Sequence, residues 1–146
     1  MVCDIHLVLE KRVKEGGWVA VDTFRGHHVS QRTQSDFMGW KNPVATERNY
    51  ERFAKLAGVR GPGPGAIGLP TDISQTARVL SDDYGEDGHS HSWLPLSDAV
   101  PIFDETECWR DFETPDNFCR KYPASFFFGV ESANIDVYRI VFWFDN

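Results

Sequence analysis

The segment DVYRIVFWFDN, residues 136–146, decides the fold class, because no other part of the chain has so strong a strand pattern. It is dense in β-branched and aromatic residues, and successive side chains of a strand point to opposite faces. Both faces would be largely apolar, with Val137, Arg139, Val141 and Trp143 on one and Tyr138, Ile140, Phe142 and Phe144 on the other. Apolar residues on both faces are typical of a central strand in a sheet that is covered on both sides.

Two further strands are predicted at the N-terminus. Residues 2–10, VCDIHLVLE, alternate with period two, with Cys3, Ile5, Leu7 and Leu9 on one face and Asp4, His6, Val8 and Glu10 on the other. Residues 18–24, WVAVDTF, have the same strand character and follow the turn-like stretch VKEGG. We therefore predict a β-hairpin over residues 2–24 with a somewhat longer loop.

A first amphipathic helix is predicted from TERNYERFAKLAGV, residues 46–59. Its apolar stripe follows the spacing i, i+3, i+4 and i+7 and consists of Tyr50, Phe53, Ala54 and Ala57. Pro43 or Thr46 would mark its start, and Gly58 stands where a glycine commonly ends a helix.

A second helix is predicted from TDISQTARVLSDDYG, residues 71–85. Asp72 and Gln75 have the spacing of a capping box, and the apolar stripe consists of Ile73, Ala77 and Leu80. Between the two helices, RGPGPGAIGLP, residues 60–70, predicts a loop, because glycine and proline interrupt any regular element there.

The remaining segments complete an α+β prediction. Residues 25–42 favour a polar surface loop, residues 97–109 favour short helices broken around Pro101, and SFFFGV, residues 125–130, favours another strand. We expect one domain over residues 1–146. It would have a mostly antiparallel sheet, built from the N-terminal hairpin and the C-terminal strand, with two or more helices packed on it.

Composition narrows the classes of function. The 146 residues carry a net charge of −7, and the pI is about 5.1. A basic stripe is absent from the sequence, so general nucleic-acid binding is disfavoured, whereas one arginine pair would suffice for a small anion. The three cysteines lack CxxC spacing, which favours reduced thiols. The N-terminus does not resemble a secretion signal, and no apolar run approaches the roughly 20 residues of a membrane span. We expect a cytoplasmic protein.

The stretch GEDGHSHSWLPL, residues 85–96, is the main candidate for metal chemistry and is predicted to be a loop. Residues i and i+2 of an extended segment point the same way, so His89 and His91 would present two imidazoles to one ion. With His6 as the third ligand, the set would suit a divalent metal such as zinc or manganese. The structural alternative is that both histidines bond to backbone or water.

Known catalytic patterns fit the chain only partly. Metalloproteases that remove ubiquitin-like tags have a proline after the HSH stretch, where this chain has Ser92, and Asp98 comes too soon for their later aspartate. Two-histidine phosphoesterases need two His-x-Ser/Thr motifs, and HVS, residues 28–30, supplies one. The chain also lacks a G-x-S-x-G motif, a Walker loop and a dinucleotide fingerprint.

Arginine and tryptophan residues give two further alternatives. Arg139, inside an apolar strand, needs a partner if it is buried, and Asp4, Glu10 or Asp145 would supply one if the terminal strands pair. The alternative is an anion-binding arginine in a pocket. Trp93 would either close the edge of the core or stack on a nucleobase, which is worth about 1–3 kcal/mol per base.

Five stretches of the chain together resemble a family of small proteins encoded by bacteriophages and prophages: CDIH (3–6), RNYERFAKLAGVR (48–60), GLPTDIS (68–74), HSHSWLPL (89–96) and YRIVFWFDN (138–146). The resemblance implies a phage accessory protein acting in the host cytoplasm, and it implies no particular reaction. It marks as motif positions His6, Arg48, Asn49, Tyr50, Arg60, Asp72, His89, His91 and Trp93.

Three functions stay open at this point. The first is binding of a nucleotide-like small molecule or a host protein, which would counter host defence, through Arg48, Asn49, Tyr50, Arg60, His89, His91 and Trp93. The second is a metal-dependent hydrolase, either a nuclease or a phosphoesterase, with His6, His89 and His91 as ligands. The third is a virion or assembly component whose aromatic side chains form an oligomer interface.

Overall fold

The computed structural model describes residues 3–24, 49–106 and 132–145. Four strands in these ranges form an antiparallel sheet in the order β2-β1-β4-β3. They are β1 (Asp4–Arg12), β2 (Trp18–Phe24), β3 (Gly88–Pro95) and β4 (Tyr138–Asp145). The N-terminal hairpin and the antiparallel sheet are therefore confirmed, and β4 lies between β1 and β3, as the apolar pattern of its sequence predicted.

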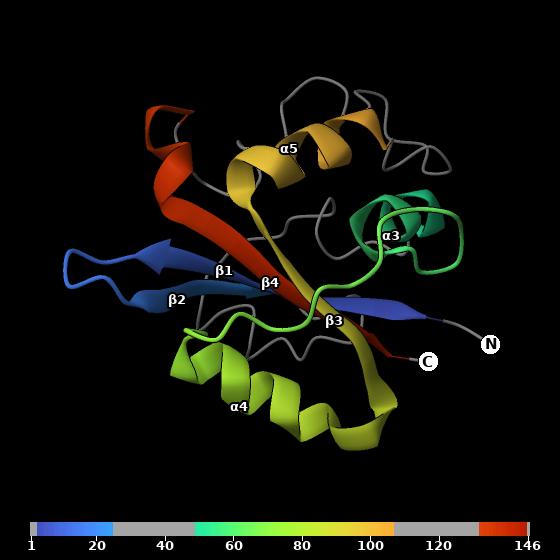
Figure 1. Ribbon diagram of the computed structural model, residues 1–146, viewed down its shortest axis with the longest axis horizontal. Helices are drawn as coiled ribbons and strands as arrows, with labels where there is room; N and C mark the ends of the chain where they lie inside the picture. Colours follow the sequence, from blue (N-terminus) through green and yellow to red (C-terminus); the bar gives the residue numbers. More distant parts are fainter. Residues whose placement is uncertain (1–2, 25–48, 107–131, 146) are drawn as a thin grey trace, which may run out of the picture.

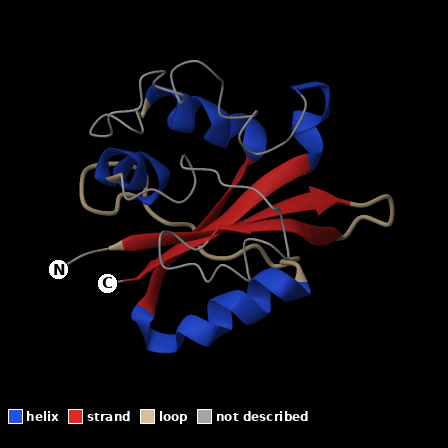
Figure 2. Ribbon diagram, turned by 180° about the vertical axis from the view of Figure 1, so that it is seen from behind, coloured by secondary structure: helices blue, strands red, loops and turns tan. Residues whose placement is uncertain are grey.

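Helices cover both faces of this sheet (Figures 1 and 2). On one face lie α3 (Tyr50–Ala57) and α5 (Leu96–Glu105), and on the other lies α4 (Gln75–Tyr84). Two short 3-10 turns, Gly85–Asp87 and Ser132–Val137, lead into β3 and β4. The fold is α+β, as predicted.

The two faces of the sheet bury different residue sets. The α3/α5 face holds the larger core, in which even-numbered residues of β4 pack against apolar side chains of α3 and α5. The α4 face holds a smaller core around Val8, Ala77 and Trp143, with Ile73 and Leu80 packed against it. The predicted apolar stripe of the second helix is confirmed by these contacts.

Both helix starts differ from prediction. α3 begins at Tyr50 after an Asn49 N-cap, rather than at Pro43 or Thr46, because the Asn49 side chain accepts a hydrogen bond from the Arg52 backbone N–H at 3.0 Å. Its predicted end at Gly58 is confirmed, with φ +67°.

The capping box predicted for the second helix is also wrong, because Ser74 is the N-cap of α4 and its hydroxyl accepts from Ala77 N–H at 3.3 Å. Asp72 instead forms an ion pair with Arg139.

Two segments have more regular structure than predicted. GHSHSWLP is not a loop but strand β3. α5 continues through Pro101, because proline removes only the hydrogen bond to the Ser97 carbonyl, and both residues are exposed, so water can satisfy that carbonyl. The predictions for residues 25–42, 109 and 125–130 lie outside the described residues.

None of the helices in the described ranges is both long and apolar enough to cross a bilayer.

Candidate functional site

A β-bulge in β3 separates the two histidines of the HSH stretch. His89 pairs with Phe144 and Ser92 pairs with Phe142, so β3 uses one more residue than β4 over this span. Ser90 takes up the extra residue with φ +54°, a conformation uncommon for residues other than glycine. The His89 ring stacks on Phe144, whereas the His91 ring stacks on Trp143, each at 6.3 Å between centroids.

His89 and His91 therefore face opposite sides of the sheet. Phe144 belongs to the α3/α5 core and Trp143 to the α4 core. The expectation that residues i and i+2 would share a face is wrong here, because the bulge shifts the alternation by one residue.

His6 lies on the α4 face, next to Trp143. Its Nδ1 is 3.0 Å from the Tyr84 hydroxyl, and its Nε2 is 3.3 Å from Asp145 Oδ2. The rings of His6 and Tyr84 lie 4.2 Å apart, which fixes the end of α4 on the sheet. His6 is thus a buried residue that joins β1, β4 and α4.

The three histidines do not converge on one point. Trp143 on β4 stands between His6 on β1 and His91 on β3, with ring distances of 6.1 Å and 6.3 Å. His89 lies on the other face. Within the described ranges, no group of three or more His, Cys, Asp or Glu residues is placed to hold a metal ion. This geometry gives the zinc or manganese hypothesis no support.

Tyr50, the first residue of α3, and Arg60, two residues after the Gly58 C-cap, lie together on the α3/α5 face. The guanidinium carbon of Arg60 lies 5.2 Å from the centroid of the Tyr50 ring, within cation–π range. The Tyr50 hydroxyl accepts a hydrogen bond from the Cys3 backbone N–H at 3.3 Å, and the ring remains 37% exposed. Arg60 is exposed and has φ +64°, a strained conformation for a residue other than glycine.

The Cys3 thiol beside this pair is poorly reactive. Burial raises the pKa of Cys3 above its ordinary value, although Arg60 acts in the opposite direction. A thiol with a raised pKa carries little thiolate, so Cys3 packs as a small apolar residue.

The Gly/Pro segment, residues 60–70, starts at Arg60, packs back on α3 and continues to β3. Just before it, Gly58 donates its N–H to Ala54 O at 2.8 Å. A Cβ on Gly63 would lie 1.8 Å from the same carbonyl oxygen, so only glycine allows the segment to fold back so closely on α3. Farther along, Gly68 N–H bonds to His91 O at 2.8 Å, which attaches the segment to β3.

A chain of ring contacts joins Tyr50 to His89. Tyr50 packs edge-on against Phe53 at 5.6 Å, Phe53 against Phe144 at 5.1 Å, and Phe144 stacks on His89. The Nδ1 atom of His89 is 2.9 Å from Ser90 Oγ. Its Nε2 atom is buried and has no hydrogen-bond partner among the described residues.

Arg139 is a structural residue, as the ion-pair alternative predicted. Its Nε lies 2.6 Å from Glu10 Oε1 and its Nη1 lies 2.8 Å from Asp72 Oδ1. The guanidinium also lies over the rings of Trp18 and Trp93, at 4.0 Å and 5.5 Å. The hydrogen bond from Arg139 holds the pKa of Asp72 below its ordinary value. Trp93 thus belongs to this network and not to the surroundings of Tyr50.

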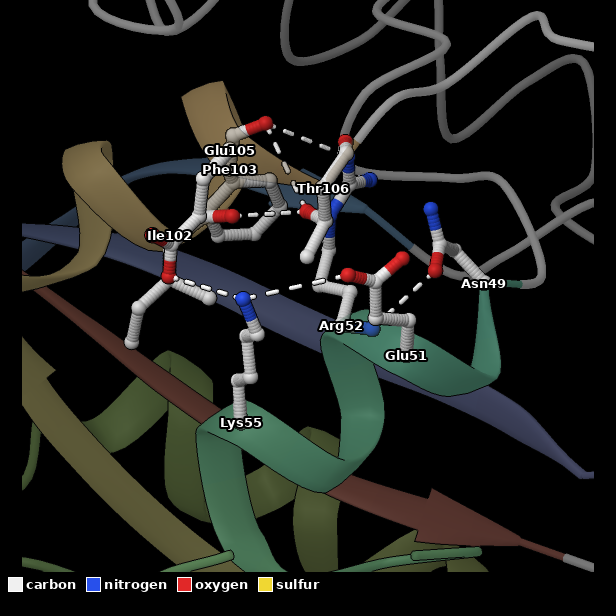
Figure 3. A network of polar contacts seen from close by, with 8 residues as sticks. All are labelled: Asn49, Glu51, Arg52, Lys55, Ile102, Phe103, Glu105 and Thr106. Carbon is white, nitrogen blue, oxygen red and sulfur yellow. Dashed lines mark hydrogen bonds and ion pairs between the residues drawn. The ribbon is translucent and has the colours of Figure 1, made fainter.

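A second buried arginine, Arg52, joins α3 to α5 (Figure 3). Its Nη2 donates to Thr106 O at 2.7 Å and its Nε to Thr106 Oγ1 at 2.8 Å. The guanidinium also lies 4.5 Å from the Phe103 ring centroid. Arg52 therefore supplies hydrogen-bond donors to carbonyl groups at the C-terminal end of α5 and ties α3 to α5.

The structure describes six of the seven predicted ligand-binding residues and divides them between two faces. Asn49, Tyr50, Arg60 and His89 lie on the α3/α5 face, and His91 and Trp93 lie on the α4 face. Arg48 lies outside the described residues. Sequence reasoning missed the contacts of Tyr84 with His6 and of Trp18 with Arg139, because each contact joins residues that are far apart in the chain.

Comparisons with known proteins gave no match to this chain among protein-family models, curated proteins or solved structures. Its function is therefore argued from the geometry above.

Acidification is expected to destabilise the fold through His91. Burial lowers the pKa of His91 from its ordinary value of 6.5, His89 adds to this effect, and Asp82 on α4 opposes it. The unfolded chain therefore binds this proton more readily. The contribution of His91 to stability is complete above pH 6.5 and falls as the pH drops toward the lower pKa of the folded state.

Urea unfolding at about pH 7.5 and about pH 5.5 measures this loss. The variant His91→Phe keeps a ring on Trp143 and is expected to lose less stability between the two pH values. An equal loss in the variant and the original chain would contradict the prediction.

Proposed function

We propose that this chain is a phage-encoded accessory protein that binds a nucleotide-like anion in the host cytoplasm and so withholds a nucleotide signal from host defence. The observation that carries the proposal is the position of Arg60, an exposed residue with a left-handed backbone, whose guanidinium lies over the ring of the 37% exposed Tyr50. The phage origin rests on the sequence resemblance.

The chemistry of the pair suits a phosphate joined to a planar base. An arginine guanidinium binds phosphate through two parallel hydrogen bonds, and an aromatic ring offers a stacking surface to any base. The guanidinium has five N–H donors, so it can keep a protein neighbour and still contact an anion. Asp4 and Asp145 act on the same Cys3 thiol as Arg60, so acidic groups lie close by and would limit the charge that the site accepts.

Net charge also favours a small ligand over a polymer. At −7, the chain would repel the phosphate backbone of DNA or RNA at long range. A single nucleotide has much less charge to repel and needs only one local cation.

Binding is tested by calorimetry against inorganic phosphate, nucleoside monophosphates and cyclic nucleotides. Arg60→Gln is expected to weaken nucleotide binding by about tenfold or more, because charged hydrogen bonds contribute roughly 1.5–3 kcal/mol. Arg78→Gln is the matched control, because Arg78 is an exposed arginine on α4, on the opposite face of the sheet.

Equal binding by the original chain and Arg60→Gln would contradict the proposal. Recovery of the nucleotide unchanged after incubation would separate a binding protein from the hydrolase considered above.

A further inference from the structure

We propose that His89 selects the ligand of this site, by hydrogen bonding from Nε2 to a sugar hydroxyl, so that the ligand class is a ribose-bearing nucleotide. This inference rests on the proposed function and names His89 as the residue that distinguishes one anion from another. The bulge at Ser90 places the His89 ring on the α3/α5 face.

The His89 ring is held in one orientation from two sides. Its face stacks on Phe144 with an interplanar angle of 28°, and its Nδ1 lies 2.9 Å from Ser90 Oγ. Ser90 makes this contact from a left-handed backbone conformation that costs of order 1 kcal/mol or more. Strained residues of this kind concentrate at ligand sites, where the strain fixes a functional group in place.

This orientation leaves the ring nitrogen Nε2 without a hydrogen-bond partner in the part of the chain that the structure describes. His89 Nε2 is buried, and none of the described residues donates to it or accepts from it. A buried polar atom normally has a hydrogen-bond partner, and exceptions call for an explanation. A group that arrives with the ligand would supply the missing partner.

His89 and Arg60 lie at the same end of the same face. Gly88 pairs with Asp145, and Asp145 and Arg60 both influence the Cys3 thiol. The Gly/Pro segment begins at Arg60, just after α3, and runs to β3 (Figure 1), where Ile67 N–H donates to Ser92 Oγ at 3.2 Å. A ligand held by Arg60 and Tyr50 would therefore extend along this segment toward His89.

The imidazole chemistry points to a hydroxyl as the partner. Nε2 is a donor or an acceptor depending on which ring nitrogen carries the proton, and that depends on the hydrogen bond between Nδ1 and Ser90. A hydroxyl both donates and accepts, so it satisfies Nε2 in either tautomer. In a nucleotide held by Arg60 and Tyr50, the hydroxyl groups that could extend toward His89 are those of the ribose.

The variant His89→Phe tests this inference. Phenylalanine keeps a ring on Phe144 and removes both ring nitrogens, and with them the contact of Nδ1 with Ser90 Oγ. Binding of a nucleoside monophosphate is expected to fall about tenfold. Binding of the 2′,3′-dideoxy analogue and of inorganic phosphate is expected to stay unchanged. The thermal midpoint of the unliganded variant should equal or exceed that of the original chain, because a buried unpaired nitrogen is gone.

The outcomes separate the two proposals. If the original chain binds the ribose and dideoxy nucleotides equally well, or if His89→Phe binds both as the original chain does, the role of His89 is overturned and the binding function stands. If the original chain binds no nucleotide and no phosphate, the proposed function fails, and the role of His89 fails with it.

Discussion

Replacing Arg139 by Met is expected to lower the free energy of unfolding by about 3–5 kcal/mol, because it leaves the Glu10 carboxylate buried without its cation. Glu10 is fully buried, and the only other hydrogen bond that its carboxylate accepts from the described residues comes from Ser74 N–H, at 2.8 Å. Methionine matches the length of the arginine stem and can keep the contacts with the Trp18 and Trp93 rings. Most of the lost unfolding free energy should therefore come from the missing charge and not from a cavity.

The double variant Glu10→Leu with Arg139→Met is the decisive comparison. Removing both charges leaves no unpaired carboxylate at position 10, so the double variant is expected to be more stable than Arg139→Met alone. Urea or guanidinium unfolding of the original chain, both single variants and the double variant gives the four free energies of a double-mutant cycle. Additive losses would show that Glu10 and Arg139 do not act as a pair.

This ion pair was predictable because its two residues belong to the strongest patterns in the sequence. The alternation of residues 2–10 and 136–146 identified the two strands, and an arginine in an apolar strand required a carboxylate on the strand beside it. Glu10 pairs directly with Arg139 in the register of β1 and β4. Regular alternation therefore carries information about contacts between residues that are far apart in the chain.

The orientation of the HSH stretch was not predictable for the opposite reason. A bulge depends on how β3 fits against β4. The sequence around Ser90 does not distinguish it from a serine in a regular strand, although its φ in the structure is +54°. One extra residue moved His89 to the other face from His91 and separated it from His6. The bulge therefore removed His89 from the predicted three-histidine site, and Trp143 stands between the other two histidines, His6 and His91.

The candidate site around Tyr50 and Arg60 was easier to find, because both residues belong to one continuous motif. Asn49, Tyr50, Gly58 and Arg60 all lie within one helix and the turn that ends it, so local geometry brings them together. The sequence did not show that the Gly/Pro segment folds back against α3, and this packing depends on Gly63.

Gly63→Ala is accordingly expected to damage both stability and ligand binding. The new Cβ would lie 1.8 Å from Ala54 O and 2.8 Å from Ala54 C, both of them backbone atoms that cannot rotate away. The Gly/Pro segment must move off α3, which should cost about 1–3 kcal/mol, the usual range for overpacking. Arg60 would move with the segment, so nucleotide affinity is expected to fall by about tenfold or more, because binding groups must be held to within roughly 0.5 Å.

Gly65→Ala is the matched control, because it lies two positions away in the same segment. A Cβ there meets no atom within 4 Å, and its backbone is outside the left-handed region. Alanine should leave nucleotide binding unchanged and raise stability by about 0.4–1 kcal/mol, by restricting the unfolded chain. Chemical unfolding and calorimetry on both variants measure the two effects. If Gly63→Ala unfolds earlier but binds nucleotide as tightly as Gly65→Ala, Arg60 does not depend on this segment, and the ligand contacts must be sought elsewhere on the α3/α5 face.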